Sequence, residues 1–375
     1  VSIFTDDNGK GRLAVAALGE DGFDEGNNSA NGTLGGAVYL YTFNDDIEAL
    51  DSGTQMNITR EARIGAGATN TNDINLEIGS QIGFDADLAG NGNSDQVSAV
   101  SLSEGADGST RLAVGVAGSD GHNDAESAAG DVLLFTFDDA TTKDFSGGAI
   151  AAVIGEGYDG DYEVALGNPG GTRAKDINLG LDTNDRFGSE LSLDYDSTLN
   201  RHRLAVIARD ERGSGNAATH LKYGGAVYLF TFTDDSFSGG AHVGTIGHSY
   251  TGTTNYDTTD LNSGSGLESK DTWSGPLTSV ALEGNYLALG AARVQVTAAK
   301  DGRVEIFSLT NNTVATQFNN IVNEGTLCTG CSGAQDVEVE PESDVTLANS
   351  DYFGIGVSLN GGRLAVGAYQ GDGAS

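Results

Sequence analysis

Two short apolar segments, Arg203-Leu-Ala-Val206 and Gly225-Ala-Val-Tyr-Leu-Phe-Thr-Phe232, decide the fold of this chain. We call such segments, which recur along the chain, the first and the second repeat phrase. The first phrase recurs, with small changes, at four other places, which begin at Arg12, Arg111, Tyr286 and Arg363. The second phrase follows the first in three further copies, which begin at Gly36, Gly130 and Gly302. Recurrence at intervals of roughly 80–100 residues indicates that one supersecondary unit is copied along the chain.

Each unit is predicted to contain four short β-strands. The two phrases supply the second and third strands, because they are rich in the β-branched and aromatic residues that favour strands. Residues 187–193 and 353–359 are the clearest first strands, and residues 149–155 and 241–247 are clear fourth strands. No segment repeats apolar residues with a helical period over three turns, so we expect very little helix.

The fold class predicted from these strands is all-β. The second and third strands are nearly continuous apolar runs, which implies that both of their faces are buried. Four-stranded antiparallel sheets that pack face to face meet this requirement, and such sheets are the blades of a β-propeller. An open β superhelix and a stack of small sandwiches remain as alternatives, because periodicity does not exclude them.

The predicted repeats cover residues 1–83, 84–186, 187–272, 273–351 and 352–375. The first repeat lacks part of its first strand, and the last contains only the start of a unit. We therefore expect that the chain is a piece of a longer array or that copies complete one another head to tail. A head-to-tail contact that does not close produces a filament.

Composition limits the partners of this 375-residue chain. It contains 54 acidic and 19 basic residues, for a net charge of −35, so nucleic acid and anionic membranes are not expected to bind it. No apolar run is long enough to insert into a membrane. Divalent cations would relieve the self-repulsion, which favours an extracellular or cell-surface location over an acidic intracellular one.

The repeats resemble a known family. Phe-Gly, an apolar strand, Leu-Ala-Val and then Gly-Ala-Val-Tyr-Leu-Phe are similar to the FG-GAP repeats of integrin α-subunit-like β-propellers in large secreted surface proteins. The resemblance is clearest at 187–232 and 353–368, and it is looser at 1–43, 84–137 and 273–307. It implies four-stranded blades, extracellular display and calcium between the first two strands of a blade. These units are longer than is common in that family.

The resemblance places a calcium loop after the first strand of a unit. The nearest matches there are Asp194, Asp196 and Asn200, followed by the weaker pair Asp6 and Asn8. Neither stretch has the full alternating ladder of Asp and Asn residues. We nevertheless expect calcium as the cofactor, with solvated acidic turns as the alternative.

A second set of candidate calcium ligands comes from the repeat itself. Asp21, Asp120 and Asp372 each lie nine residues after the arginine of the repeat phrase, and glycine follows each of them. Calcium requires six to eight oxygen ligands, and glycine allows a loop to turn tightly around the ion.

Cys328 and Cys331 are the two cysteines of the chain. A single Cys-x-x-Cys can be a redox motif, half of a zinc site or a small disulfide loop. No second Cys or His pair accompanies it to complete a zinc site, and its surroundings are glycine-rich rather than βαβ. A structural disulfide between the two cysteines is the favoured interpretation.

Sequence motifs of catalysis are lacking. Gly155–Gly160 fits a dinucleotide-binding pattern, but the following residues cannot form the helix that this pattern requires. No metalloprotease or nucleophile-elbow motif occurs. We therefore expect no enzyme but an extracellular structural protein that self-assembles head to tail into a filament or sheath. The alternative is a calcium-dependent adhesin propeller that binds a glycan or protein ligand.

Overall fold

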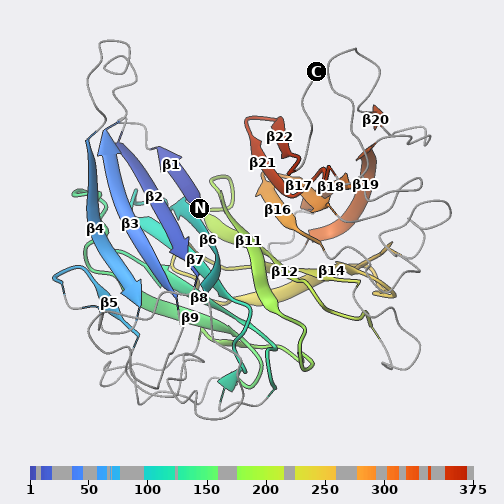
Figure 1. Ribbon diagram of the computed structural model, residues 1–375, viewed down its shortest axis with the longest axis horizontal. Coiled ribbons are helices and arrows are strands. Elements are labelled where there is room, and N and C mark those ends of the chain that lie inside the picture. Colours follow the sequence, from blue (N-terminus) through green and yellow to red (C-terminus); the bar gives the residue numbers. More distant parts are fainter. Residues whose placement is uncertain are drawn as a thin grey trace. The chain divides into compact units, whose positions relative to one another are not determined.

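The computed structural model shows an all-β protein (Figure 1). It describes residues 1–5, 10–18, 36–44, 57–65, 68, 70–76, 97–122, 126–158, 175–214, 224–258, 277–292, 302–311, 318–328, 337–338 and 351–369. Within these ranges the elements are all strands, as predicted. The described residues contain no helix that is long and apolar enough to cross a membrane.

Four five-stranded sheets follow one another along the chain, and a two-stranded sheet comes last. The first contains β1 (Ser2–Thr5), β2 (Lys10–Ala17), β3 (Ala37–Asn44), β4 (Ile58–Gly65) and β5 (Ile74–Asn75). The second contains β6 (Val97–Glu104), β7 (Thr110–Val116), β8 (Asp131–Thr136), β9 (Ala149–Gly155) and β10 (Ile177–Asn178). The third contains β11 (Phe187–Asp196), β12 (Arg201–Ala208), β13 (Ala226–Thr231), β14 (Ala241–Gly247) and β15 (Tyr256–Asp257). The fourth contains β16 (Ser279–Glu283), β17 (Tyr286–Ala291), β18 (Arg303–Asn311), β19 (Phe318–Cys328) and β20 (Val337–Glu338), and the last pairs β21 (Gly356–Asn360) with β22 (Arg363–Gly367).

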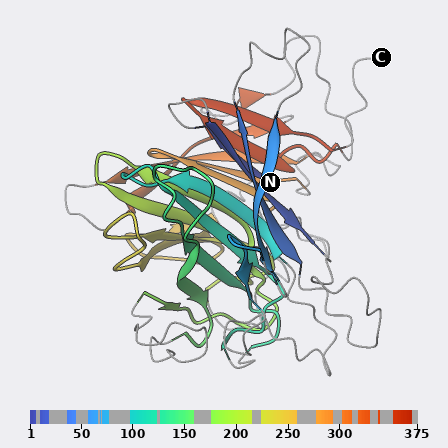
Figure 2. The same cartoon turned by 90° about the vertical axis from the view of Figure 1, so that its left-hand side faces the viewer.

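Each five-stranded sheet has the same internal geometry. Its strands lie in chain order, so that strands adjacent in sequence are neighbours in the sheet. Figure 2 shows the same strands turned by 90°. The third and fourth strands are antiparallel, and the register shifts between the fourth and fifth residues after the glycine of the second phrase. This shift occurs at Leu40/Tyr41, Leu134/Phe135, Leu229/Phe230 and Ile306/Phe307. A β-bulge at one position in four sheets shows that the repeat in sequence is a repeat in structure.

The fifth strand was not predicted. It is only two residues long and runs parallel to the fourth strand. In the second sheet the carboxylate of Asp176, just before β10, accepts a hydrogen bond from the backbone N–H of Val153 in β9 at 2.8 Å. Asp73 and Asn255 do the same for Arg63 and Thr245 in the first and third sheets. One side chain thus holds the short strand in place.

The Phe-Gly pairs pack against glycines of the preceding sheet. A Cβ added to Gly115 would lie 2.0 Å from the carbonyl oxygen of Gly188, and one added to Gly130 would lie 2.0 Å from that of Phe187. Gly354 and Phe353 repeat the arrangement against the two corresponding glycines of the fourth sheet, Gly290 and Gly302. The Phe-Gly signature is therefore a close backbone contact that only glycine permits.

The chain forms two compact units. The first contains residues 1–189, 195–202 and 232–240, and the second contains residues 190–194, 203–231 and 241–375. The core of the first unit comes from both of its complete sheets and includes Leu40, Leu133 and Phe135. Aliphatic and aromatic side chains such as Leu229, Leu289 and Phe307 form the core of the second.

The fold prediction is confirmed: the chain is all-β, with tandem sheets of the β-propeller type. The fourth strand of the fourth sheet is β19, which begins at Phe318 and ends at Cys328. Its pairing with β18 covers eight residue pairs. The predicted repeat boundaries remain predictions.

Candidate functional site

The predicted calcium loop between β11 and β12 is closed by its own hydrogen bonds. Asp196 Oδ1 accepts from the backbone N–H groups of Thr198 and Leu199 at 3.0 and 3.1 Å. The hydroxyl of Tyr195 donates to Asn200 Oδ1 at 2.6 Å. This is the local bonding by which Asp and Asn side chains stabilise a tight turn.

Other predicted ligands also bind protein groups. Asp194 forms an ion pair with Arg203, and Asp120 Oδ1 accepts from the backbone N–H of Ala128 at 2.6 Å. Four predicted ligands lie outside the described residues, namely Asp6, Asn8, Asp21 and Asp372. Within the described part of the chain, no three His, Cys, Asp or Glu side chains are grouped to hold a metal ion. Calcium binding therefore remains a prediction.

The cysteine motif lies at the end of a strand rather than inside a loop. Cys328 is the last residue of β19, is 2% exposed and is disulfide-bonded. Cys331 lies outside the described residues, so its place in the predicted pair remains a prediction.

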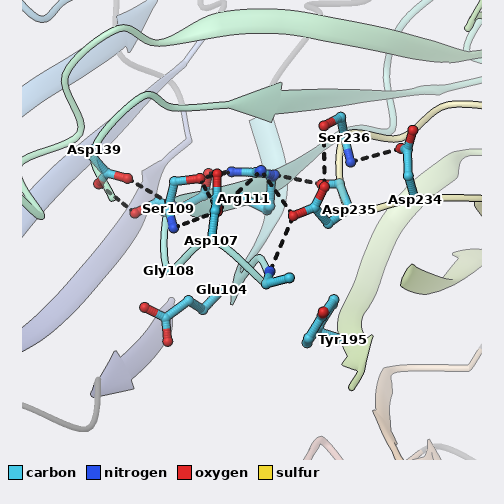
Figure 3. A network of polar contacts seen from close by, with 12 residues as sticks. Glu104, Asp107, Gly108, Ser109, Arg111, Asp139, Tyr195, Asp234, Asp235 and Ser236 are labelled. Atoms are coloured by element: carbon cyan, nitrogen blue, oxygen red, sulfur yellow. Dashed lines mark hydrogen bonds and ion pairs between the residues drawn. The ribbon is translucent and has the colours of Figure 1, made fainter. Parts of the chain in front are cut away.

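A polar network in the first unit centres on the arginine of the second repeat phrase (Figure 3). We define the Arg111 site as Asp107, Ser109, Arg111, Tyr195 and Asp235. Arg111 lies in β7, and Asp107 and Ser109 lie in the turn between β6 and β7. Asp235 lies in the connection between β13 and β14, and Tyr195 lies near the end of β11. The site is therefore formed by strands and turns that belong to two different sheets.

The guanidinium of Arg111 holds the two turns together. Its Nε donates to the backbone oxygen of Asp235 at 2.6 Å, and one terminal nitrogen donates to Ser109 Oγ. The other terminal nitrogen lies 3.6 Å from a carboxylate oxygen of Asp107 and 3.6 Å from one of Asp235. The Asp235 carboxylate also accepts from the backbone N–H of Ala106 at 3.2 Å. The fork of donors on arginine suits such convergent pairing.

Exposure differs sharply across this site. The side chain of Arg111 is 4% exposed, whereas those of Asp107 and Asp235 are 54% and 19% exposed. Asp107 Oδ1 accepts two hydrogen bonds from Ser109, through its N–H and its hydroxyl, at 2.8 and 2.5 Å. Asp107 Oδ2 has no partner among the described residues. A fixed carboxylate thus presents an open acceptor to solvent.

The electrostatics keep this carboxylate ionised. Burial alone would raise the pKa of Asp107, but hydrogen bonds from Ser109 and the charge of Arg111 lower it below its ordinary value. Burial raises the pKa of the Tyr195 hydroxyl, and the nearby charges of Asp235 and Asp107 raise it further. The site therefore offers an anionic acceptor and a neutral phenol.

Buried polar groups hold the turn between β6 and β7 from its inner side. Thr110 donates to Asp139 through its N–H at 2.7 Å and through its hydroxyl at 2.6 Å. Arg12 reaches the same hydroxyl oxygen at 2.6 Å and forms an ion pair with Glu104 at 3.5 Å. The arginine of the first repeat phrase thus braces the turn that carries Asp107. Such anchoring keeps the site rigid.

The Arg111 site was not predicted from the sequence, in which this arginine only marks the start of a strand. A usable signal was present, because arginine at the edge of a buried strand requires partners that neutralise it. Its partners lie up to 124 residues away in sequence, so no local motif could name them.

A second polar cluster in the first unit surrounds Asp131. This side chain is 1% exposed, and its Oδ2 accepts from the hydroxyls of Ser119 at 2.5 Å and Tyr158 at 3.0 Å. Burial raises its pKa to about 7, and the negative charges of Asp120 and Glu156 add to the increase. Its Oδ1 has no partner among the described residues. This carboxyl is enclosed, so it is a structural group rather than part of a surface site.

Comparisons with known proteins give a distant structural likeness. The sequence matches no protein family, and no curated protein matches it. Among solved structures, the chain is similar to a thermostable family-43 glycoside hydrolase, with 8% identity and a TM-score of 0.39. The match covers 99% of this chain and 80% of that one.

Two functional predictions are corrected by this comparison. We expected a structural protein that self-assembles into a filament, or an adhesin, and we expected no enzyme. The matched structure is a glycoside hydrolase, so both predictions are contradicted and neither is carried further. At this identity and TM-score, the likeness does not transfer that activity to the present chain.

Proposed function

We propose that the first unit binds a neutral carbohydrate at the Arg111 site. The observation that carries the proposal is the ionised carboxylate of Asp107, which is fixed through one oxygen and open at the other. Sugar hydroxyls donate well to such an acceptor, because a hydrogen bond to a charged group is stronger than a neutral one. Tyr195 adds a half-exposed aromatic ring of the kind that binding sites combine with a few fixed polar groups.

Charge supports a neutral ligand over an anionic one. The site contains two carboxylates and a single guanidinium, and the whole chain has a net charge of −35. Sulfated or uronic-acid sugars would be repelled both at long range and at Asp107. Neutral oligosaccharides avoid that repulsion while keeping the hydroxyl donors that the site can accept.

The test is retention on immobilised neutral oligosaccharides, followed by measurement of Kd for the best ligand. Asp107→Asn removes the charge but keeps an oxygen that can accept from Ser109, and it should weaken binding about tenfold. Asp138→Asn is the matched control, because Asp138 is an exposed aspartate of the same unit outside the site. Release of reducing sugar is measured in the same samples.

Equal affinity of the wild type and both variants would remove the Arg111 site from the proposal. Failure to retain the chain on any neutral oligosaccharide would refute carbohydrate binding itself. Preference for sulfated over neutral sugars would contradict the charge argument.

We also propose that the repeats are FG-GAP-type units of an extracellular protein and that acidic turns bind calcium. The Phe-Gly contacts at Phe187 and Phe353 support the first point, because both pairs have the same backbone role. The net charge supports the second, since divalent cations reduce self-repulsion. If those turns bind calcium, calcium chloride should raise the Tm more than sodium chloride of equal ionic strength does.

A further inference from the structure

A buried histidine borders the Arg111 site. His202 is the second residue of β12 and is fully buried, and its ring centre lies 5.1 Å from that of Tyr195. The ring centre of Phe237 lies 5.3 Å from the same imidazole. Phe237 is also fully buried and follows Asp235 by two residues. One imidazole therefore packs against Tyr195 and against the turn that carries Asp235.

A hydrogen bond ties this imidazole to the strand next to β7. Nε2 of His202 lies 3.2 Å from the hydroxyl oxygen of Ser103. Ser103 lies in β6, directly opposite Arg111 in the pairing of β6 with β7. His202 thus connects Tyr195 and the Asp235 turn to the two strands that carry the rest of the site.

The surroundings of His202 keep its imidazole neutral. Its Nδ1 has no hydrogen-bond partner among the described residues, so an imidazolium would bury an N–H donor that lacks an acceptor. Burial and the positive charge of Arg111 lower the pKa of His202 to about 3, against the opposing charges of Asp234 and Asp107. A neutral ring can pack beside a buried guanidinium without repulsion.

The repeat itself does not require a ring at this position. His202 directly precedes the first repeat phrase of its sheet, and the corresponding residues of the other copies are Gly11, Thr110, Asn285 and Gly362. All four of those copies form the same antiparallel pair of strands without a ring there. The imidazole of His202 therefore serves its own surroundings, which include Tyr195, rather than the formation of the strand pair.

We propose that His202 is a positioning residue of the Arg111 site, which holds the ring of Tyr195 and the turn of Asp235 in the arrangement that binds a sugar. The contribution to sugar binding rests on the proposed function, whereas the placement of Tyr195 does not. Packing of the ring carries this role, because the imidazole is neutral and adds no charge. Another aromatic ring should therefore replace it, and an aliphatic side chain should not.

The first measurement is the rate at which tetranitromethane nitrates Tyr195 in the full chain. Trypsin cleaves after Arg186 and Arg201, and the peptide between them contains a single tyrosine, so mass spectrometry reports on Tyr195 alone. His202→Ala should speed nitration about threefold or more, because the ring loses its packing partner. His202→Phe should keep the wild-type rate. Where His202→Ala does not fold, His202→Leu is measured, because it fills the space without a ring.

Leu133→Ala is the control for a general loss of packing. Leu133 is fully buried in the core of the same unit, so this variant should lower the Tm and leave nitration of Tyr195 unchanged. The second measurement is the Kd for maltohexaose and cellohexaose, two uncharged sugars that differ in linkage. His202→Ala should raise the Kd about fivefold, and His202→Phe should raise it less than about twofold.

The two measurements separate this inference from the proposed function. Equal nitration rates in the wild type and His202→Ala would overturn the positioning role, even if a sugar binds. Faster nitration in Leu133→Ala would overturn it too, because any loss of core packing would then free the ring. The expected nitration rates in a wild type that binds neither sugar would support the placement of Tyr195 and count against carbohydrate binding. Faster nitration of His202→Ala with an unchanged Kd would overturn the link between that placement and the ligand.

Discussion

At the residue scale, Asp131 stands out because equivalent positions in two other sheets are alanine, at Ala37 and Ala226. Its pKa is raised from 3.8 to about 7, chiefly by burial. The folded chain therefore keeps a proton that the unfolded chain releases above pH 4. Stability consequently falls as pH rises from about 4 to 7 and stays level above that, by on the order of 4 kcal/mol for this group.

Asp131→Asn should remove this pH dependence, because the amide stays neutral while its oxygen can still accept from Ser119 and Tyr158. We expect the variant to gain stability relative to the wild type at pH 8 and to differ little at pH 4. The measurement is the free energy of unfolding in urea across that range. Asp138→Asn is the exposed control, and a constant difference between Asp131→Asn and the wild type at all pH values would contradict the prediction.

At the element scale, one polar side chain next to the short fifth strand bonds to the backbone of the fourth strand. Asp176 accepts from the N–H of Val153, and Asn255 does the same for Thr245 in the third sheet. Asp176→Ala should therefore lower stability by about 1–2 kcal/mol and speed amide exchange at Val153. Asp176→Asn should preserve both, since asparagine already performs this role at residue 255.

Chemical denaturation and amide exchange of the two variants and the wild type check this prediction. If Asp176→Asn were as damaging as Asp176→Ala, the carboxylate charge rather than the hydrogen bond would hold β10. The signal for this element was present in the sequence as Asp-Ile-Asn-Leu at 73–76 and 176–179. A two-residue strand has too little apolar pattern to be recognised without its partner.

At the scale of the whole molecule, we expect the net charge to lower stability when little salt is present. A charge of −35 on 375 residues makes the folded state repel itself, and salt screens that repulsion. Raising sodium chloride from about 0.01 to 0.5 M should therefore raise the Tm by about 5 °C or more. An unchanged or lower Tm would show that the acidic groups are already neutralised by local partners.

The effect of bound calcium on the Tm is distinguished from general charge screening by comparing two salts at the same ionic strength. If the acidic turns hold calcium, calcium chloride should raise the Tm beyond sodium chloride of equal ionic strength, and chelator should reverse the gain. Equal Tm values in the two salts would reject a specific calcium site.

The sequence by itself determined the repeat, the all-β class and the positions of most strands. These features depend on side-chain patterns only a few residues long, such as Arg-Leu-Ala-Val and the third-strand phrase. Tertiary structure alone decided the Arg111 site and the enclosure of Asp131, because their partners come from distant turns and strands. It also decided that the sequence Arg-Leu-Ala-Val-Gly is buried at 111–115 in β7 and only partly buried at 363–367 in β22, since burial depends on neighbouring segments that a local sequence does not specify.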